Sequence, residues 1–230
     1  MIKVIAINSS PHMDKGNTAL ILNPFLEGIK EAGAEVELFY TKKLKINPCQ
    51  GDFSCSIKNP GECFQKDDMQ KIYPKLYKAD IWVFATPLYV SGMTGPMKNL
   101  IDRILIPMGL PYLELRDGHC HHPLREFVKN GKIVLVSNCG YWELNNFDLL
   151  INQIKALCSH AEREFAGALL RPHGPVLRSM SEKGANVDDI FKAAKEAGKQ
   201  LIENGKMTLK TLKIISRELL PLEVYLPPKS

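Results

Sequence analysis

The sequence predicts a doubly wound α/β fold built on a parallel sheet of five strands. Two observations lead to this prediction. Short apolar runs rich in β-branched residues recur along the 230-residue chain, and helical patterns separate them. Continuous apolar strands that alternate with helices are typical of a parallel sheet with helices on both faces. Residues are 45% hydrophobic and 24% charged, the ordinary balance of a globular domain.

Each expected strand is a short run in which Val, Ile, Phe or Trp either predominates or alternates with polar residues. The first, third and fourth runs are nearly continuous, as in strands buried on both faces, whereas the second alternates. In chain order the expected strands are 3–8, 35–40, 80–86, 132–138 and 163–170.

Each expected helix follows one of these strands. Gly33 marks the end of the first helix, and Asp68 is the expected N-cap of the second. Residues 47–66 and 107–130 are expected to be irregular. Five such units favour the flavodoxin-like strand order 2-1-3-4-5. In chain order the expected helices are 18–32, 68–77, 94–106, 144–160 and 188–203.

We expect one flavodoxin-like domain over residues 1–205 and a C-terminal extension over residues 206–230. The extension lies outside the five strand–helix units, and we expect it to pack on its own domain or on a second subunit. One short helix could form there. Its apolar face would carry Leu209, Leu212, Ile215 and Leu219.

Charge and hydropathy exclude several classes of function. The formal net charge is +5, and the residues after Gly205 contribute +3 of it, from five basic and two acidic side chains. No basic stripe interleaved with aromatic residues is present, so we expect no nucleic-acid partner. No apolar run is long enough to span a bilayer, and the first eight residues lack a signal-peptide cleavage site. We therefore expect a cytoplasmic protein with no membrane partner.

The loop after the first expected strand could hold a phosphate. It is rich in hydroxyl and amide side chains and leads directly into a helix, whose N-terminal N–H groups and dipole favour an anion. It has neither a P-loop nor a Gly-x-Gly-x-x-Gly pattern, so no NTP or dinucleotide site is indicated. The alternative is a polar turn with an ordinary helix cap. The candidate residues are Ser9, Ser10, His12, Gly16, Asn17 and Thr18.

Two motifs carry a family resemblance. Ser10–His12 and Gly16–Thr18 form the first, and Ala85–Arg103 contains the second, a Pro-x-Tyr turn followed by Lys-x-x-x-Asp-Arg. In both, the chain resembles the NAD(P)H-dependent FMN reductases and the related iron-sulfur flavoproteins, which have Ser-Pro-Arg-x-x-Gly-Asn-Thr in the first loop. Here His12 replaces the Arg and the loop is one residue longer. Histidine is a pH-dependent partner for a phosphate.

The resemblance covers about residues 1–205 and implies an FMN site built from three loops. The phosphate would lie at Ser10–Thr18, and the ring would lie between the second loop and the loop after the fourth strand. An isoalloxazine ring needs hydrogen-bonding groups and a face on which to stack. The alternative for the second loop is a plain strand–turn–helix without a ligand. The alternative for Cys139 is that it is a small buried hydrophobic residue with no part in the site. The residues assigned to the ring are Pro87, Leu88, Tyr89, Val90, Ser91, Gly92, Asn138, Cys139, Gly140 and Tyr141.

The resemblance also implies a function. The chain would pass electrons from NAD(P)H through bound FMN to a small acceptor such as a quinone or a flavin. The cofactor carries this chemistry, so no acid or base residue is assigned as catalytic. The alternatives are an iron-sulfur flavoprotein that accepts electrons from ferredoxin and a flavin-fold interaction protein without turnover. Relatives imply a homodimer or homotetramer.

Three of the six cysteines, Cys49, Cys55 and Cys63, cluster in the loop 47–66. Such spacing in a cytoplasmic protein indicates metal or redox chemistry. The iron-sulfur branch of the family uses four thiolates, but Asp52 stands here in place of the second, and a carboxylate is a poorer ligand for such a cluster. The residues favour a loop of inert thiols. Two alternatives stay open: a cluster held by the three cysteines with Asp52 as the fourth ligand, and a redox-active pair of cysteines.

A second metal-like run is His119-Cys120-His121-His122. Adjacent residues rarely point at one ion, and no partner pair stands at zinc spacing. We expect this run to cover the flavin rather than to bind a metal.

Overall fold

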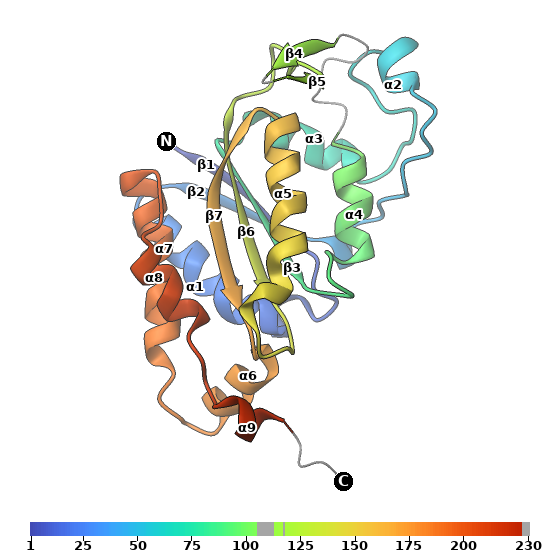
Figure 1. The fold of residues 1–230 in the computed structure, drawn as a ribbon. Helices are drawn as coiled ribbons and strands as arrows, with labels where there is room; N and C mark the ends of the chain where they lie inside the picture. Colours follow the sequence, from blue (N-terminus) through green and yellow to red (C-terminus); the bar gives the residue numbers. More distant parts are fainter. Residues whose placement is uncertain (105–112, 117, 227–230) are drawn as a thin grey trace.

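The computed structural model describes residues 1–104, 113–116 and 118–226. Its centre is a five-stranded parallel sheet in the order β2-β1-β3-β6-β7 (Figure 1), which confirms the predicted flavodoxin-like order. All five strands coincide with predicted ones to within a residue. Their bounds are Lys3–Asn8 for β1, Glu35–Tyr40 for β2, Ile81–Pro87 for β3, Gly131–Asn138 for β6 and Arg163–Arg171 for β7.

The register of the sheet brings several strand ends to one edge. Asn8 of β1 lies opposite Ala85 of β3, and Pro87 of β3 lies opposite Asn138 of β6. Asn138 is in turn opposite Arg171, the last residue of β7. The loops that follow β1, β3, β6 and β7 therefore leave the sheet side by side.

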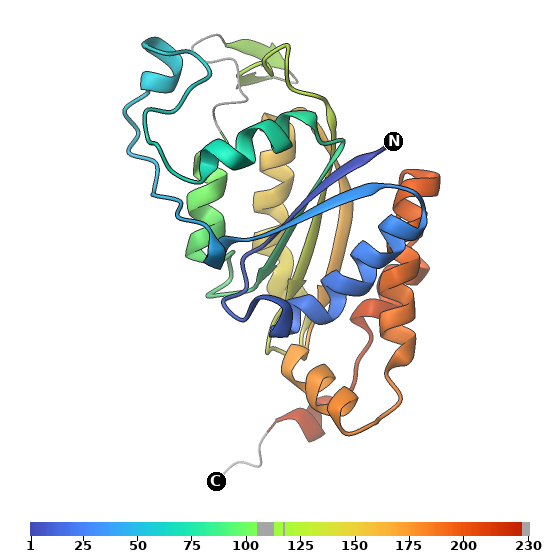
Figure 2. The same cartoon turned by 180° about the vertical axis from the view of Figure 1, so that it is seen from behind.

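Two groups of helices cover the two faces of the sheet (Figures 1 and 2). Alternation along β3 shows the two cores, because Val83 belongs to one and Trp82 and Phe84 to the other. The first face carries α1 (Asn17–Glu31), α6 (Gly174–Glu182), α7 (Asp188–Asn204) and α8 (Leu209–Ser216). The second face carries α3 (Met69–Lys78), α4 (Gly95–Asp102) and α5 (Asp148–His160).

The structure differs from the prediction in the connecting segments. Part of the stretch 107–130, expected to be irregular, is a hairpin in which β4 (Glu114–Arg116) pairs antiparallel with β5 (His119–His121). These three-residue strands show no apolar alternation that could announce them. Three short helices were also missed, and residues 105–106 of the expected helix 94–106 lie outside the described residues. The missed helices are α2 (Ser54–Ile57), α6 and α9 (Leu222–Tyr225).

Asp68 is the N-cap residue of α3, as predicted, but its side chain makes no capping hydrogen bond. Asp67 accepts a hydrogen bond from the N–H of Met69 at 3.1 Å. The carboxylate of Asp68 instead accepts from the N–H of Lys45 at 2.7 Å. The prediction that Asp68 caps α3 through its side chain is therefore wrong, because that side chain ties α3 to the preceding loop.

The segment after Gly205 packs on the first face of the sheet. Ile215 of α8 is fully buried, and Leu212 and Leu219 pack partly buried against the same core. Leu209 is 77% exposed, so its expected place on the apolar face of this helix is wrong. Within the described ranges, none of the helices is both long enough and apolar enough to cross a membrane.

Candidate functional site

A pocket of about 230 Å³ lies at the carboxyl edge of the sheet. It is bounded by the loops after β1, β3 and β6 and by the start of α6. The prediction that three loops separated in sequence lie together is thus met by the geometry, and Pro175 is the only lining residue that had not been predicted. The lining residues are Ser10, His12, Asn17, Thr18, Pro87, Leu88, Tyr89, Asn138, Cys139, Gly140 and Pro175.

The loop after β1 curves tightly around its own polar groups. The side-chain oxygen of Asn8 accepts from the N–H of Ser10 at 2.9 Å, and Ser10 Oγ accepts from the N–H of His12 at 3.3 Å. Gly16 lies against this curve, where an added Cβ would come within 2.4 Å of Ser10 Oγ. A side chain at position 16 would therefore displace the Ser10 hydroxyl from its bond to His12.

The first residues of α1 have partners from distant parts of the chain. Asn17 Oδ1 accepts from Nε of Arg178 on α6 at 2.7 Å, which leaves the amide NH₂ of Asn17 as a donor. Thr18 Oγ1 donates to Asn138 Oδ1 at 2.6 Å and so joins the first loop to the third. The N-terminus of a helix of this length favours an anion.

Ser9 lies beneath the first loop, outside the pocket lining. It is buried, and its hydroxyl accepts from Thr94 Oγ1 at 2.7 Å. The same hydroxyl lies 3.4 Å from the carbonyl of Ala85. Thr94 is the N-cap of α4. Ser9 therefore connects β1 to the start of α4.

The turn after β3 forms the second wall of the pocket. Pro87 and Leu88 are buried, whereas Tyr89 is half exposed at the rim. Tyr89 and Gly92 exchange two backbone hydrogen bonds, at 2.9 and 3.1 Å. The two residues between them, Val90 and Ser91, are exposed and left-handed, with φ of +47° and +63°. Val90, Ser91 and Gly92 shape the turn but do not line the pocket.

The loop after β6 forms the third wall. Cys139 is buried, and burial raises the pKa of its thiol. Its backbone is held on both sides, because its N–H donates to Arg171 O at 3.1 Å and its carbonyl accepts from the N–H of Gly174 at 2.8 Å. Cys139 therefore serves as a neutral, packed wall residue. Tyr141 is exposed beyond the lining.

The three clustered cysteines surround a second, smaller cavity of about 50 Å³, which Asp52 also lines. Cys63 Sγ accepts a hydrogen bond from Nη2 of the buried Arg103 at 3.3 Å. Burial raises the pKa of the Cys55 thiol. Over the described part of the chain, no three His, Cys, Asp or Glu side chains are placed to hold one metal ion.

The arginine beside this cavity is part of a buried ion pair. Arg103 Nη1 binds the carboxylate of Asp67, and both side chains are almost fully buried. Burial alone would raise the pKa of Asp67, but the hydrogen bonds from Arg103 and from the N–H groups of Asn47 and Met69 lower it on balance. Asp67 is therefore ionised and neutralises the guanidinium that faces Cys63.

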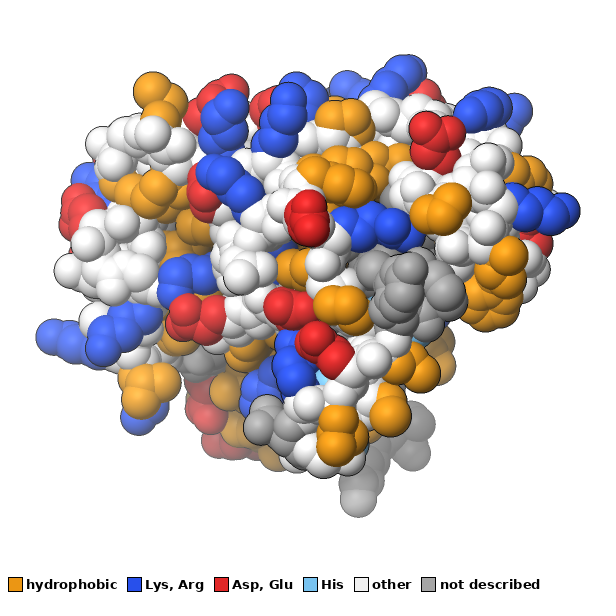
Figure 3. Space-filling view, turned by 90° about the horizontal axis from the view of Figure 1, so that it is seen from above, with side chains coloured by type: hydrophobic (Ala, Val, Ile, Leu, Met, Phe, Trp, Pro, Cys, Tyr) orange, Lys and Arg blue, Asp and Glu red, His pale blue; other side chains and the backbone are white. Residues whose placement is uncertain are grey.

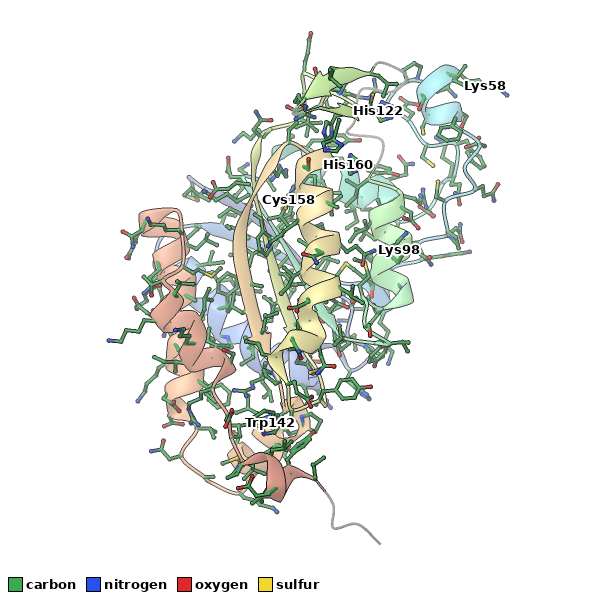
Figure 4. The ribbon with its side chains drawn as sticks, viewed as in Figure 1. Lys58, Lys98, His122, Trp142, Cys158 and His160 are labelled. Carbon is green, nitrogen blue, oxygen red and sulfur yellow. The ribbon has the colours of Figure 1, made fainter. Side chains whose placement is uncertain are left out.

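The two cavities lie at opposite ends of α4. This helix begins just after the turn that forms the second wall of the pocket, and Asp102 and Arg103 at its other end line the cysteine cavity. A rise of 1.5 Å per residue separates these ends by roughly 12 Å. Lys98 projects from α4 (Figure 4) and pairs with Asp102. Figure 3 shows the face of the molecule that carries α2 and the β4–β5 hairpin. Basic, acidic and hydrophobic side chains are mixed on this face, and no single kind forms a large patch.

The histidine run lies far from the pocket. His119 and His121 are in β5, and the His121 ring is 5.3 Å from that of His160. Figure 4 shows His122 beside His160, at the end of the molecule opposite Trp142, which lies in the third loop. The expectation that the run 119–122 covers the flavin pocket of its own chain is therefore wrong. These residues precede β6, whereas the pocket is at the end of β6.

Two residues of the site were missed because both lie after the fifth strand. Pro175 closes the pocket, and Arg178 holds Asn17 and, at 2.7 Å, the carbonyl of Lys15. The sequence does contain a signal for the helix that carries them. Gly174-Pro175 places proline in the first turn, where its missing N–H costs nothing.

A parallel sheet of this order, with a pocket at the carboxyl ends of its first, third and fourth strands in chain order, defines the flavodoxin-like class of α/β proteins. Residues 2–136 match the sequence model of the family described as NADPH-dependent FMN reductase. This match covers more than half of the chain, and the chain belongs to that family, whose cofactor is FMN. The matched segment contains the first two loops of the pocket, and the third loop follows it directly.

Several curated relatives are named iron-sulfur flavoproteins. The chain is 41% identical over 102 residues to one from Archaeoglobus fulgidus, and 39% identical over 102 residues to one from Methanocaldococcus jannaschii. Each alignment covers 44% of this chain, and 48% and 50% of the two relatives. The chain thus spans about half the length of the curated relatives it matches.

Solved structures share the fold. An FMN-dependent NADH-azoreductase from Bacillus anthracis, in complex with FMN, has a TM-score of 0.61 at 15% identity, over 88% of this chain and 100% of that one. An NAD(P)H:quinone oxidoreductase from Methanothermobacter marburgensis has a TM-score of 0.59 at 18% identity, over 87% and 96% of the two chains. At this level of identity the likeness concerns the fold.

Proposed function

We propose that this protein binds FMN in the pocket at the carboxyl edge and passes electrons from NAD(P)H to a small acceptor such as a quinone or a flavin. The observation that carries the proposal is the convergence of the loops after β1, β3 and β6 on one pocket. Family membership and the names of structural neighbours support the same reaction class.

The residues of the pocket fit the two ends of FMN. The tight curve at Gly16, the amide of Asn17 and the N-terminus of α1 suit a phosphate. The buried Pro87 and Leu88 and the half-exposed Tyr89 offer apolar and aromatic surface for a ring.

Each predicted site residue has a proposed task within this arrangement. Ser10 shapes the phosphate loop, His12 lies exposed at its rim, and Thr18 holds Asn138 in place. Cys139 and Gly140 border the ring from the third loop. Bound FMN supplies the hydride and electron chemistry, so the side chains bind and orient rather than exchange protons.

The remaining predicted site residues act from outside the lining. Ser9 supports the loop from below, and Val90, Ser91 and Gly92 fix the turn that presents Tyr89. Tyr141 stands exposed beyond the third wall. We also propose that the protein is cytoplasmic and has no nucleic-acid or membrane partner. We propose that it forms a homodimer or a homotetramer, and gel filtration of the purified protein would measure the size of this assembly.

An absorbance titration of the purified protein with FMN tests the proposal directly. We expect stoichiometric binding with two resolved flavin bands, and steady consumption of NADH or NADPH when a quinone is added. A protein that stays colourless and does not change the spectrum of added FMN would contradict the proposal.

The Gly16→Ala variant tests where the phosphate lies. An added Cβ would come within 2.4 Å of Ser10 Oγ, so this hydroxyl must turn away from the N–H of His12, and we expect the Kd for FMN to rise about three- to tenfold. Gly95→Ala is the matched control, because its added Cβ meets no atom within 4 Å and its φ is ordinary. Equal Kd values for the two variants would place the phosphate elsewhere.

A second candidate function is that of an iron-sulfur flavoprotein accepting electrons from ferredoxin. It is favoured by the gathering of Cys49, Cys55 and Cys63 around one cavity and by the names of the curated relatives. Iron and sulfide assays on protein purified without oxygen distinguish the two. Stoichiometric iron that is lost in Cys55→Ser would support this second function.

A further inference from the structure

The loop after β6 is hydrogen-bonded along its outer side at four consecutive carbonyls. Gly174 donates its N–H to Cys139 O at 2.8 Å, and His173 donates its N–H to Tyr141 O at 3.0 Å. The His173 ring nitrogen Nε2 lies 3.0 Å from Trp142 O. The fourth carbonyl, that of Gly140, accepts from the hydroxyl of Tyr225 in α9. Three of these bonds come from the turn after β7, and one comes from the C-terminal segment.

Tyr225 reaches this loop as the outer member of a stack of three rings. Its ring is 5.1 Å from that of His173 at an angle of 29°, and the Trp142 ring is 5.9 Å from His173 at 31°. The indole N–H of Trp142 also donates to Leu220 O at 3.0 Å. Figure 4 shows Trp142 between the end of the sheet and the C-terminal segment. The loop and the segment are therefore joined at several points.

A buried arginine anchors the segment that carries Tyr225. Arg171, at the end of β7, is fully buried and donates to Ile215 O at 2.7 Å and to Arg217 O at 2.6 Å. These carbonyls lie at the C-terminal end of α8 and just beyond it. Arg217 is held in turn by the carboxylate of Asp189, at 2.6 and 2.8 Å. These bonds fix the backbone between α8 and α9 and so place the segment that carries Tyr225.

The outward carbonyls determine where the N–H groups of the loop point. In a trans peptide the C=O of one residue and the N–H of the next lie in one plane and point in opposite directions. The Cys139 carbonyl points to Gly174 and the Gly140 carbonyl to Tyr225, so the N–H of Gly140 points away from Gly174 and the N–H of Tyr141 points away from Tyr225. Neither N–H donates to a protein acceptor within the ranges that the structure describes, and Gly140 lines the pocket.

We propose that Tyr225 is a positioning residue for FMN. Its hydroxyl holds the Gly140 carbonyl outward and thereby presents the N–H of Tyr141, in the same peptide unit, to the pocket as a donor for the ring edge. The proposal rests on the proposed function and assigns the C-terminal segment to the cofactor site, although that segment lies outside the three loops.

The Tyr225→Phe variant tests the proposal, because it keeps the stacked ring and removes only the hydroxyl. Loss of one positioning hydrogen bond should raise the Kd for FMN about three- to tenfold. The visible spectrum and midpoint potential of bound FMN should shift, since the hydrogen bond at the ring edge changes. In the flavin-free protein, amide hydrogen exchange over residues 139–142 should accelerate. Val224→Ala is the matched control, on the same helix and 62% exposed, and should behave as wild type.

Three outcomes separate this proposal from the one on which it rests. If wild type binds FMN and Tyr225→Phe matches it in Kd, spectrum and exchange, the positioning role is overturned and the FMN site stands. If wild type does not bind FMN, both proposals fail. If Tyr225→Phe lowers thermal stability but leaves the spectrum and potential of bound FMN unchanged, the contact is structural only and the proposal is again overturned.

Discussion

Arg163 and Arg171 begin and end the same strand, β7, and both are buried. Neither is held mainly by a carboxylate. Arg163 donates to Ala79 O and Lys129 O at 2.8 Å, and its guanidinium carbon lies 3.8 Å from the centre of the Trp82 ring. Burial lowers the pKa of each guanidinium to about 10, so both stay charged at neutral pH. Backbone carbonyls from several segments therefore meet at each end of the strand.

We expect Arg163→Met to lower the free energy of unfolding by several kcal/mol. The substitution keeps the apolar stem but removes the donor from the buried Ala79 carbonyl and the partly buried Lys129 carbonyl. Leaving a buried carbonyl unpaired costs about 1–3 kcal/mol. Urea unfolding measures the change. Lys155→Met is the matched control, because its ammonium stands on the exposed face of α5, 5.8 Å from the Phe165 ring. An exposed cation–π contact contributes only about 0.5–1 kcal/mol, so similar losses in both variants would refute the role of the carbonyls.

His173 makes stability depend on pH. Burial lowers its pKa below the usual 6.5, the hydrogen bond to the Trp142 carbonyl opposes this, and nearby Arg171 adds to it. The folded state therefore holds its proton less tightly than the unfolded chain. As pH falls through 6.5, unfolding takes up a proton, and the free energy of unfolding should fall by up to about 1.4 kcal/mol per pH unit until the folded pKa is reached.

Urea unfolding between about pH 8 and about pH 5 checks this dependence. His173→Asn is the comparison, because asparagine tolerates the left-handed φ of +54° at this position but does not titrate. The two proteins should run parallel above about pH 7 and diverge below it. Curves that stay parallel throughout would show that His173 has an ordinary pKa.

At the scale of elements, α1 and α7 approach each other closely at two glycines. A Cβ on Gly198 would lie 2.2 Å from Phe25 O, and one on Gly28 would lie 1.9 Å from Lys195 O. Each glycine thus admits the backbone of the facing helix. The close crossing holds α7 against α1, whose first residues, Asn17 and Thr18, line the pocket.

We expect Gly198→Ala to separate these helices. Overpacking of this kind costs about 1–3 kcal/mol, even though alanine is the better helix former. Thermal unfolding measures the loss. Lys192→Ala, on the exposed side of the same helix, is the control and should be close to neutral. A stabilised Gly198→Ala would mean that helix propensity outweighs the close approach.

Strands β1, β3 and β6 were predictable because burial on both faces requires nearly continuous apolar runs. Strand β2 was predictable from its alternation, and the helices from their apolar spacing and caps. Connecting elements lacked that signal. The hairpin of β4 and β5 consists of Glu, Leu, Arg, His and Cys in three-residue strands, which are too short to show a pattern. Helix α6 begins with Gly-Pro, which reads as a turn although proline is well placed in a first helical turn.

Most of the pocket was predictable at the scale of the whole molecule, because the carboxyl ends of parallel strands meet at one edge. The supporting residues of the pocket could not be predicted, because they contact it from positions far away in the sequence. Arg178 contacts Asn17 across 161 residues, and Tyr225 contacts Gly140 across 85. No local sequence motif indicates either contact. The three loops were recognised by their own residues, whereas the groups that hold them from behind were not.

The anchoring of α8 by Arg171 has a consequence for synthesis on the ribosome. Residues 1–205 contain every strand of the sheet, yet two carbonyl partners of Arg171 belong to residues 215 and 217. While these residues are still in the exit tunnel, the last strand holds a guanidinium whose acceptors have not emerged. A nascent chain should therefore finish the far edge of its sheet only after residue 217 has left the tunnel, and until then chaperones that cover unfinished sheet edges could bind it.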